Sequence, residues 1–308
     1  MATKPVLARF DWSIASRARV VRPASLADYW ALTKPEVNFL ILITTFAGFY
    51  LAREAGWRDF PFWLSINALL GTLLVASGTG TLNQYIERRF DAQMRRTARR
   101  PLAAGRLKPA AVLWFGLALS VVGSLYLVAA VNILASLLTI ATLLAYLFFY
   151  TPLKRKTPLC TLVGAFPGAM PPLIGWAAAS GKLDLHAWIL YAIVFLWQFP
   201  HFMAIAWMYR EDYARAGYLV LPPGPSARIR LVHLQTVLPL LALVPLSFLP
   251  AVDELRFYLI GALLLGAGFL YYGAQFAVSR SNSAARRLLA ASIIYLPALF
   301  VAMLLARV

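Results

Sequence analysis

The sequence predicts an all-α, polytopic membrane protein with about nine transmembrane helices around a central cavity that opens at the cytoplasmic face. Three observations predict this fold class. First, 61% of the 308 residues are hydrophobic and only 13% are charged, whereas a soluble domain carries about 25% charged residues. Second, 14% of the residues are aromatic, a content that excludes a disordered chain. Third, the apolar residues gather in runs that approach or exceed the length of about 20 residues needed to cross a bilayer.

The apolar runs define the expected helices in chain order. They lie at residues 36–52, 63–86, 109–129, 131–149, 159–180, 186–208, 231–250, 257–278 and 287–306. The stretch 109–149 is twice the spanning length, so we divide it into two helices. Gly168, Pro171 and Pro172 interrupt the fifth run, and such residues are tolerated in a membrane only where neighbours satisfy the freed backbone groups. We therefore expect a broken fifth helix that forms part of the cavity wall.

The basic residues predict the orientation in the membrane. The chain has 29 Lys and Arg against 12 Asp and Glu, a net charge of +17. With nine spans and a cytoplasmic N-terminus, 24 of the 29 basic residues fall on the cytoplasmic side, as the positive-inside rule requires. This distribution indicates contact with anionic lipid headgroups rather than nucleic acid. We predict a multi-pass protein of the inner (cytoplasmic) membrane, with a basic cytoplasmic tail at 1–30 and a single transmembrane domain at 31–308.

The most informative polar residues follow the second apolar run. Asn83, Glu87 and Asp91 are spaced i, i+4, i+8, so on a continuing helix they form one stripe. Magnesium prefers carboxylate oxygens and leaves coordination positions for substrate phosphates, so the stripe suggests a diphosphate-bearing lipid substrate. Four basic residues that would neutralise phosphate oxygens follow directly, namely Arg95, Arg96, Arg99 and Arg100. The alternative is an ion-pair network at a solvated helix end.

A second acidic group follows the sixth run, at Glu211 and Asp212. If the second and sixth helices lie side by side, Asp212 would converge with Glu87 and Asp91 on one cavity. Such a cavity would hold either two metal ions or one ion and a basic clamp, and both arrangements stabilise charge on a leaving diphosphate. The alternative is a helix-ending Asp before Gly217, which is a helix stop signal.

The order of these motifs resembles the UbiA-type intramembrane prenyltransferases, whose first motif is Asn-x-x-x-Asp-x-x-x-Asp, and among them most closely the protoheme IX farnesyltransferases, also called haem O synthases. The matching blocks are Leu32 to Pro35, Asn83 to Leu102, Tyr150 to Thr157, Gly168 to Trp176, Phe195 to Phe202 and Asp212 to Gly217. Two positions depart from the superfamily pattern. Glu87 stands where many members have Asp, and Ala216 stands where a second Asp-x-x-x-Asp motif would end, which puts a full second metal site in doubt.

The resemblance implies a magnesium-dependent enzyme that moves a farnesyl group from farnesyl diphosphate to a vinyl group of haem B, with addition of water, to give haem O for haem-copper terminal oxidases. The metal ligands it implies are Asn83, Glu87, Asp91 and Asp212. The catalytic residues are Glu87, Asp91, Asp212 and His201. The substrate-binding residues are Lys34, Asn83, Arg95, Arg96, Tyr150, Lys154, Arg155 and Trp197. Haem B, farnesyl diphosphate and the bilayer are the expected partners, and a haem A synthase or an oxidase assembly factor is a candidate protein partner.

The role of His201 is open at this point. It follows Pro200 inside the expected helix 186–208, and an ionisable residue within the membrane is by default a functional candidate. It would ligate or orient haem, accept a proton from the added water, or simply be a structural histidine satisfied by a backbone carbonyl. Cys160 is the only cysteine, which rules out an intramolecular disulfide.

Three other functions compete with this one. The first is the same chemistry on another acceptor, such as a quinone precursor, against which the block Phe195 to Phe202 argues. The second is a transporter of an anionic lipid or metabolite, but transporters place charges near the midplane, whereas Glu87, Asp91 and Asp212 are expected at one membrane face. The third is a non-catalytic assembly factor whose arginine-rich loop binds a partner.

Overall fold

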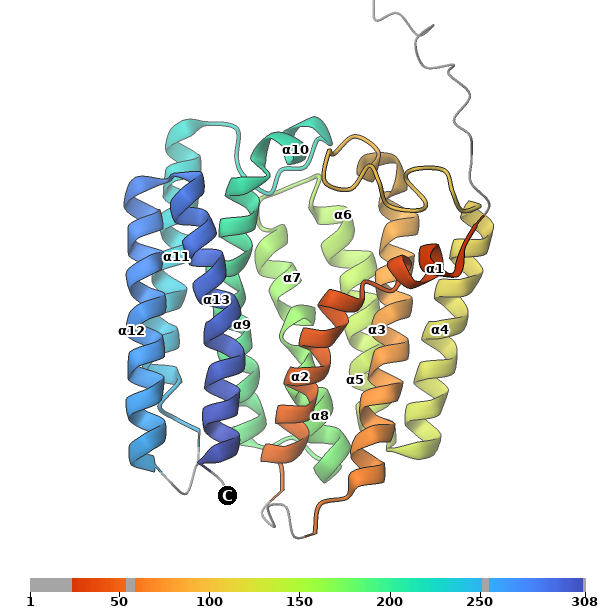
Figure 1. Cartoon of the computed structure of the whole chain (residues 1–308), viewed down its shortest axis with the longest axis vertical. Coiled ribbons are helices and arrows are strands. Elements are labelled where there is room, and N and C mark those ends of the chain that lie inside the picture. Colours follow the sequence, from red (N-terminus) through yellow and green to blue (C-terminus); the bar gives the residue numbers. More distant parts are fainter. Residues whose placement is uncertain (1–23, 54–58, 251–254, 307–308) are drawn as a thin grey trace, which may run out of the picture.

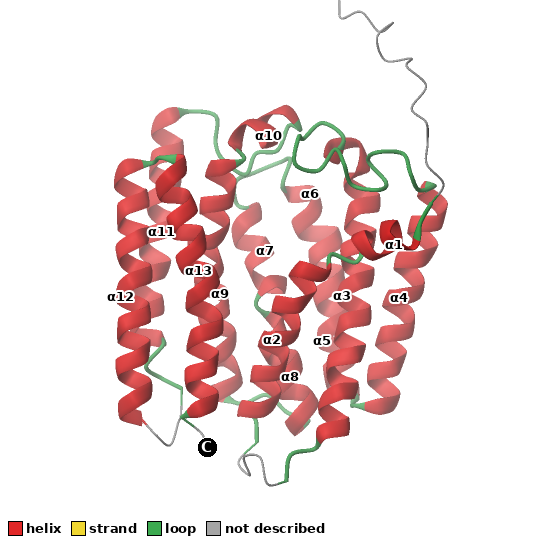
Figure 2. Ribbon diagram, in the orientation of Figure 1, coloured by secondary structure: helices red, strands yellow, loops and turns green. Residues whose placement is uncertain are grey.

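The computed structural model describes residues 24–53, 59–250 and 255–306. Within these ranges the regular structure is helical, and the helices stand roughly parallel in one bundle (Figures 1 and 2). The all-α prediction is confirmed. The helices are α1 (Leu26–Leu32), α2 (Pro35–Leu51), α3 (Phe62–Asp91), α4 (Pro109–Ala130), α5 (Ile133–Leu144), a π-helical segment η2 (Ala145–Tyr150), α6 (Thr151–Leu153), α7 (Cys160–Gly168), α8 (Met170–Ser180), α9 (Leu185–Met208), α10 (Arg210–Arg215), α11 (Pro225–Leu246), α12 (Leu255–Ser279) and α13 (Asn282–Leu305).

The membrane spans follow the predicted runs. Within the described residues, eight helical stretches are long and apolar enough to cross a membrane, and α2 is a shorter apolar helix of 17 residues. The predicted span 131–149 is built from α5, η2 and α6, which continue one another as Ile133–Leu153. The predicted span 159–180 is broken at Ala169 into α7 and α8, because prolines 167, 171 and 172 lack the N–H groups that a continuous helix uses.

The boundary predicted at residue 30 is not a structural boundary. Residues 1–23 of the predicted tail lie outside the described ranges, but residues 26–32 form α1. A capping box between Ser25 and Asp28 starts this helix, an arrangement that satisfies two of its free backbone N–H groups. The Asp28 carboxylate also accepts a hydrogen bond from Arg106 at 2.7 Å, which lowers the pKa of Asp28. Local capping and this ion pair therefore attach residues 25–32 to the bundle.

The loops separate by charge between the two ends of the bundle. The segment between α3 and α4, helix α10 and the connection between α12 and α13 lie at the upper end in Figure 1, whereas α13 ends at the lower end. The upper end carries the loops that the distribution of Lys and Arg predicts to be cytoplasmic. The helix order therefore agrees with the alternation of basic and poorly charged loops.

Close helix contacts surround a space between α3 and α9. Helix α8 packs against both, and α2 packs against α8 and α3. The contact between α2 and α8 requires glycine, because a Cβ at Gly175 would lie 1.8 Å from the Thr45 carbonyl oxygen. On the other side, α9, α11, α12 and α13 share one large apolar core. The condition considered for the second and sixth spans, that they lie side by side, is not met, because α3 and α9 face each other across a cavity.

Candidate functional site

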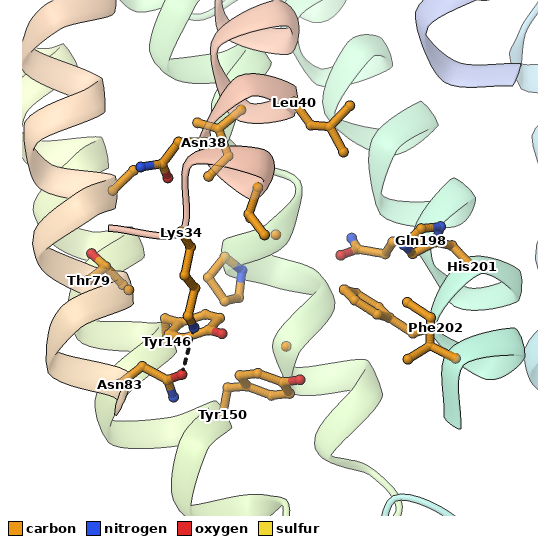
Figure 3. Close-up of a pocket in the computed structure, with 18 of the residues that line it drawn as sticks. Lys34, Asn38, Leu40, Thr79, Asn83, Tyr146, Tyr150, Gln198, His201 and Phe202 are labelled. Carbon is orange, nitrogen blue, oxygen red and sulfur yellow. Dashed lines mark hydrogen bonds between the residues drawn. The ribbon is translucent and has the colours of Figure 1, made fainter. Parts of the chain in front are cut away.

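The space enclosed by α2, α3, η2, α7, α9 and α13 is a cavity of about 490 Å³. Its lining changes in character along its length. Charged and polar groups line one part, including Lys34, Asn83, Glu87, Asp91, Arg96, Arg100, Lys154 and Tyr218. Apolar side chains line the rest, including Val37, Leu40, Ile41, Ile174, Val194, Phe202, Ile293 and Leu296. Figure 3 shows Lys34 and Asn83 on one side of the cavity, with Gln198, His201 and Phe202 opposite.

The predicted stripe on α3 lines the charged part of the cavity. Asn83, Glu87 and Asp91 are 1%, 5% and 1% exposed, and all three line the cavity. The prediction that they share one helix face is supported by a direct bond from the Asn83 side-chain amide to Glu87 Oε2 at 3.0 Å. A buried amide and two buried carboxylates therefore present hard oxygen atoms to a single space.

Glu87 is the centre of the densest network. Lys154 Nζ donates to Glu87 Oε1 at 2.8 Å and to Oε2 at 3.1 Å, and the Tyr218 hydroxyl donates to Oε1 at 2.9 Å. Burial by itself lowers the pKa of Lys154, but the adjacent Glu87 carboxylate outweighs it and holds the pKa well above its usual value. Lys154 is therefore charged in the folded protein, where its ammonium also lies 4.5 Å from the centre of the Tyr150 ring.

Two further cations face the stripe from other segments. Lys34 Nζ donates to Asn83 Oδ1 at 2.9 Å (Figure 3), and Arg100 NH1 bonds both carboxylate oxygens of Asp91 at 2.9 and 2.8 Å. Burial, with the nearby charges of Arg100 and Lys154, lowers the pKa of Lys34 to about 7. Lys34 has a left-handed backbone conformation with φ of 53°, a strained position for a non-glycine residue. The turn before α2 thus places this ammonium in the cavity.

Asp212 does not join the other carboxylates. Its side chain pairs with Arg215 and accepts a hydrogen bond from the backbone N–H of Arg96 at 3.2 Å, and Asp212 is not among the residues that line the cavity. Across the described ranges, no three acidic, His or Cys side chains gather closely enough to hold a metal ion by themselves. The expected convergence of Asp212 with Glu87 and Asp91 is therefore not found, because Asp212 lies on α10, which continues α9 on the opposite side of the cavity.

The predicted arginines divide into two groups. Arg96 lines the cavity and its guanidinium lies 4.7 Å from the centre of the Tyr209 ring. Arg95 is exposed and does not line the cavity. Arg155 is also exposed and outside the lining, because its guanidinium covers the Phe90 ring at 4.2 Å. The structure therefore brings Arg96 to the site but places Arg95 and Arg155 on the surface beside it.

The α9 wall carries the predicted Trp197 and His201. Their rings stack with centroids 4.8 Å apart, and both line the cavity. Trp197 Nε1 donates to the backbone oxygen of Ser292 on α13 at 2.8 Å, and His201 Nδ1 lies 2.8 Å from the Ser292 hydroxyl. His201 is thus partnered by a hydroxyl from another helix, rather than by the backbone carbonyl considered for a structural histidine.

Sequence reasoning missed two residues of the site. Tyr218, a partner of Glu87, lies after Gly217 in a segment with no motif spacing. Gln198 stands within the block Phe195 to Phe202, but only the structure shows its amide in the cavity, bonded to the Ala165 carbonyl at 2.8 Å. The signal for Gln198 was available, because a buried amide in a membrane helix needs partners.

The donor set of the α3 stripe fits magnesium bound together with a substrate. Mg²⁺ is usually held by one or two carboxylates, with substrate phosphates and waters completing an octahedron. Glu87 and Asp91, with the Asn83 amide oxygen, supply that number of hard ligands on one helix face. The three facing cations would be free to pair with phosphate oxygens once a metal ion takes the carboxylates.

Comparisons with known proteins agree on one family. Residues 41–304 match the model of the UbiA prenyltransferase family. The protoheme IX farnesyltransferase of Solibacter usitatus is 47% identical over 291 residues, which cover 92% of this chain and 99% of that protein. The protoheme IX farnesyltransferase of Koribacter versatilis is 40% identical over 307 residues, which cover 96% of this chain and 99% of that protein.

Solved structures show the same fold at low sequence identity. A digeranylgeranylglyceryl phosphate synthase structure superposes with a TM-score of 0.74 at 17% identity, covering 92% of this chain and 98% of that chain. A UbiA homolog from Archaeoglobus fulgidus, bound to GPP and Mg²⁺, superposes with a TM-score of 0.62 at 13% identity, covering 90% of this chain and 99% of that chain.

Proposed function

This chain belongs to the UbiA prenyltransferase family and, within it, to the protoheme IX farnesyltransferases, and from that premise we propose that it transfers the farnesyl group of farnesyl diphosphate to a vinyl group of haem B, with addition of water. The products are haem O and diphosphate. The observation that carries the proposal is one cavity with basic and acidic side chains at one part and a mostly apolar wall around the rest. Such a cavity suits a substrate with an anionic head and a long apolar tail.

The charged part binds and stabilises the diphosphate. Lys154 and Arg100 pair with the carboxylates of Glu87 and Asp91, and Lys34 donates to the Asn83 amide oxygen. Arg96 also lines the cavity, so basic side chains outnumber the two carboxylates. Fixed donors in a water-poor site stabilise developing negative charge without reorganisation during the reaction. These cations are therefore placed to stabilise the diphosphate as the allylic carbon–oxygen bond breaks and the oxygen keeps the electron pair.

Magnesium belongs at the same end of the cavity. Asn83, Glu87 and Asp91 would hold it, with diphosphate oxygens completing the coordination. When bound, the ion supplies Lewis-acid stabilisation of negative charge on the leaving group. A UbiA homolog of the same fold was solved with GPP and Mg²⁺ bound, which supports a magnesium-dependent reaction. Since Asp212 lies outside the cavity lining, the arrangement favours one ion with a basic clamp over two ions bridged by Asp212.

The apolar part holds the farnesyl chain and the macrocycle. Tyr146 and Tyr150 of η2 line the cavity between the charged end and the apolar wall, and their ring centroids lie 5.1 Å apart. Aromatic faces carry negative electrostatic potential and attract cations. These rings would stabilise an allylic carbocation, while the apolar wall formed by residues such as Phe202 keeps bulk water away from it.

We place the protein in the inner membrane, with the N-terminus and the charged end of the cavity on the cytoplasmic side. This orientation rests on the basic loops at that end of the bundle and the positive-inside rule. A role in supplying haem-copper terminal oxidases, with a haem A synthase or an oxidase assembly factor as partner, follows from the proposed product. Reporter fusions after residue 306 and in the loop between α3 and α4 test the orientation, since we expect them on opposite sides.

The function is tested by incubating the detergent-purified protein with haem B, farnesyl diphosphate and Mg²⁺ and analysing the extracted pigment by mass spectrometry. We expect a haem heavier by one farnesyl group and one hydroxyl group, and no such product after chelation of magnesium. Unchanged haem B with farnesylation of a quinone precursor would move the activity to another acceptor. No turnover with either acceptor would favour a transporter or an assembly factor.

A further inference from the structure

Gln198 is held in one orientation by its amide nitrogen. Nε2 donates to the Ala165 carbonyl at 2.8 Å and lies 3.5 Å from the Phe195 carbonyl. Two carbonyl acceptors on one side require the nitrogen there, so Oε1 takes the other position. Gln198 is 2% exposed and points into the cavity (Figure 3). Among the described residues, Oε1 accepts no hydrogen bond.

Gly168 makes this orientation possible. A Cβ at Gly168 would lie 2.3 Å from Gln198 Oε1, so any larger residue would displace the amide. Two distant motifs, Gly168 to Trp176 and Phe195 to Phe202, therefore meet at one buried oxygen atom. The break between α7 and α8 places the Ala165 carbonyl, and the missing side chain of Gly168 leaves room for Oε1.

His201 is held in one tautomer by Ser292. The Ser292 hydroxyl donates its single hydrogen to the Leu289 carbonyl at 2.6 Å. With its hydrogen given to Leu289, the hydroxyl oxygen accepts from His201 Nδ1, which lies 2.8 Å away. In a neutral imidazole the second nitrogen is then an acceptor. His201 Nε2 thus carries a free lone pair beside the cavity, and no group in the described part of the chain donates a hydrogen bond to it.

Gln198 and His201 are three residues apart on α9, so they share a face one helical turn apart. Both present acceptor atoms without donors in a wall that is otherwise apolar. A ligand that suits two acceptors has two hydrogens to donate. We propose that Gln198 Oε1 and His201 Nε2 hold the water molecule that is added to haem, that His201 accepts its proton, and that Ser292 is the positioning residue for His201.

The step balances on the proposed function, on which this inference rests. The C1 carbon of the farnesyl group bonds to the terminal vinyl carbon of haem B, and diphosphate leaves with the electron pair of the broken bond. The inner vinyl carbon is then cationic. With both hydrogens bound by the two acceptors, the water oxygen directs a lone pair to that carbon and forms the new carbon–oxygen bond, while one proton passes to His201 Nε2.

The test measures what happens to the cation on the inner vinyl carbon. Without a positioned water, the cation loses a proton and gives an alkene lighter than haem O by one water. We expect the ratio of hydroxylated to alkene product to fall about a hundredfold in His201→Gln, the lower range for loss of a general base. We expect a fall of about fivefold in Ser292→Ala, which loses one hydrogen bond, and recovery in Ser292→Thr, which keeps the hydroxyl.

Matched variants separate this role from simple loss of structure. Gln198→Leu removes the amide oxygen at similar volume and should lower the same ratio, whereas His186→Gln changes a histidine of α9 near its other end, half-exposed and outside the cavity, and should leave it unchanged. Membrane abundance and the thermal midpoint in detergent verify folding of each variant. Because the readout is a ratio of two products, partial loss of total activity does not obscure it.

Three outcomes would overturn the inference. Full hydration of the product in Gln198→Leu and Ser292→Ala would place the water elsewhere. Haem B is also added to the native protein and to His201→Gln, and the haem absorption band is recorded; a band shift that His201→Gln abolishes, with hydration intact, would make His201 an iron ligand. If the unmodified protein forms no farnesylated haem, the proposed function fails and the inference with it, whereas farnesylated product with unaltered hydration overturns the inference alone.

Discussion

The two walls of the cavity differ in how their polar atoms are used. On the α3 side, the carboxylates of Glu87 and Asp91 are engaged by cations or hydroxyls at 2.8 to 3.1 Å. On the α9 side, Gln198 and His201 are neutral and keep acceptor atoms without donors in the described chain. The charged wall must exchange its own bonds for those of a substrate, whereas the neutral wall is already arranged for a ligand.

The two walls therefore act in different ways. A buried charge pair is costly to break from one side only, so the α3 side couples folding stability to substrate binding. On the α9 side, the neutral groups contribute little to folding stability, and they act by orienting the ligand. Variants of the charged wall should therefore change stability and activity together, while variants of the neutral wall should change mainly the outcome of the reaction.

Removing one partner of the buried pair should have the largest effect. Lys154→Gln leaves Glu87 buried, with the side chain of Lys154 only 12% exposed in the native protein, and should lower the free energy of unfolding by about 3–5 kcal/mol. The thermal midpoint in detergent measures this loss. The double variant Lys154→Gln, Glu87→Gln should recover most of the stability and none of the activity; an equally unstable double variant would refute the coupling.

Removing Asp91 should mainly abolish catalysis. Asp91→Ala removes a proposed metal ligand and the partner of Arg100, and we expect kcat to fall by about 10²–10³-fold, as for loss of one preorganised electrostatic group. Steady-state turnover at saturating Mg²⁺ measures the change. The control Asp184→Asn keeps the N-cap of α9 and should retain activity. Comparable activity in Asp91→Ala would remove the stripe from the mechanism.

Filling the space beside Gln198 should have a moderate effect. Gly168→Ala forces the Gln198 amide away from a Cβ that would lie 2.3 Å from Oε1, at a cost of about 1–3 kcal/mol for overpacking. Gly261→Ala is the matched control, since nothing lies within 4 Å of a Cβ there, and it should be neutral or slightly stabilising. Equal thermal midpoints for the two variants would contradict the predicted crowding.

The exposed arginines should have the smallest effect. Arg95→Ala and Arg155→Ala alter side chains outside the cavity lining, and exposed charges contribute about 0.2–1 kcal/mol. We expect the KM for farnesyl diphosphate to rise less than about fivefold in each, within that energy range. Arg100→Ala, which removes the partly buried partner of Asp91, should change this KM more. A larger effect from Arg95 than from Arg100 would mean that the loop rearranges around the substrate.

Much of the fold was determined by the sequence alone. Hydrophobic runs of spanning length and the asymmetry of basic loops identify a polytopic helical protein, because the bilayer requires helices of fixed length with internal hydrogen bonds. The i, i+4, i+8 spacing placed Asn83, Glu87 and Asp91 on one face, since helical geometry is local. The same periodicity gave no indication of which cations face the stripe.

Packing between helices determines which distant residues meet. This packing separates Asp212 from the carboxylates, brings Tyr218 to Glu87, and leaves Arg95 at the surface. It also joined Gly168 to Gln198 and His201 to Ser292. These contacts depend on how the helices pack and on where helices such as α7 and α8 are interrupted. The spacing of residues along one helix encodes neither the packing nor the interruptions. A sequence pattern therefore specifies the face of a helix, and packing between helices specifies its partner.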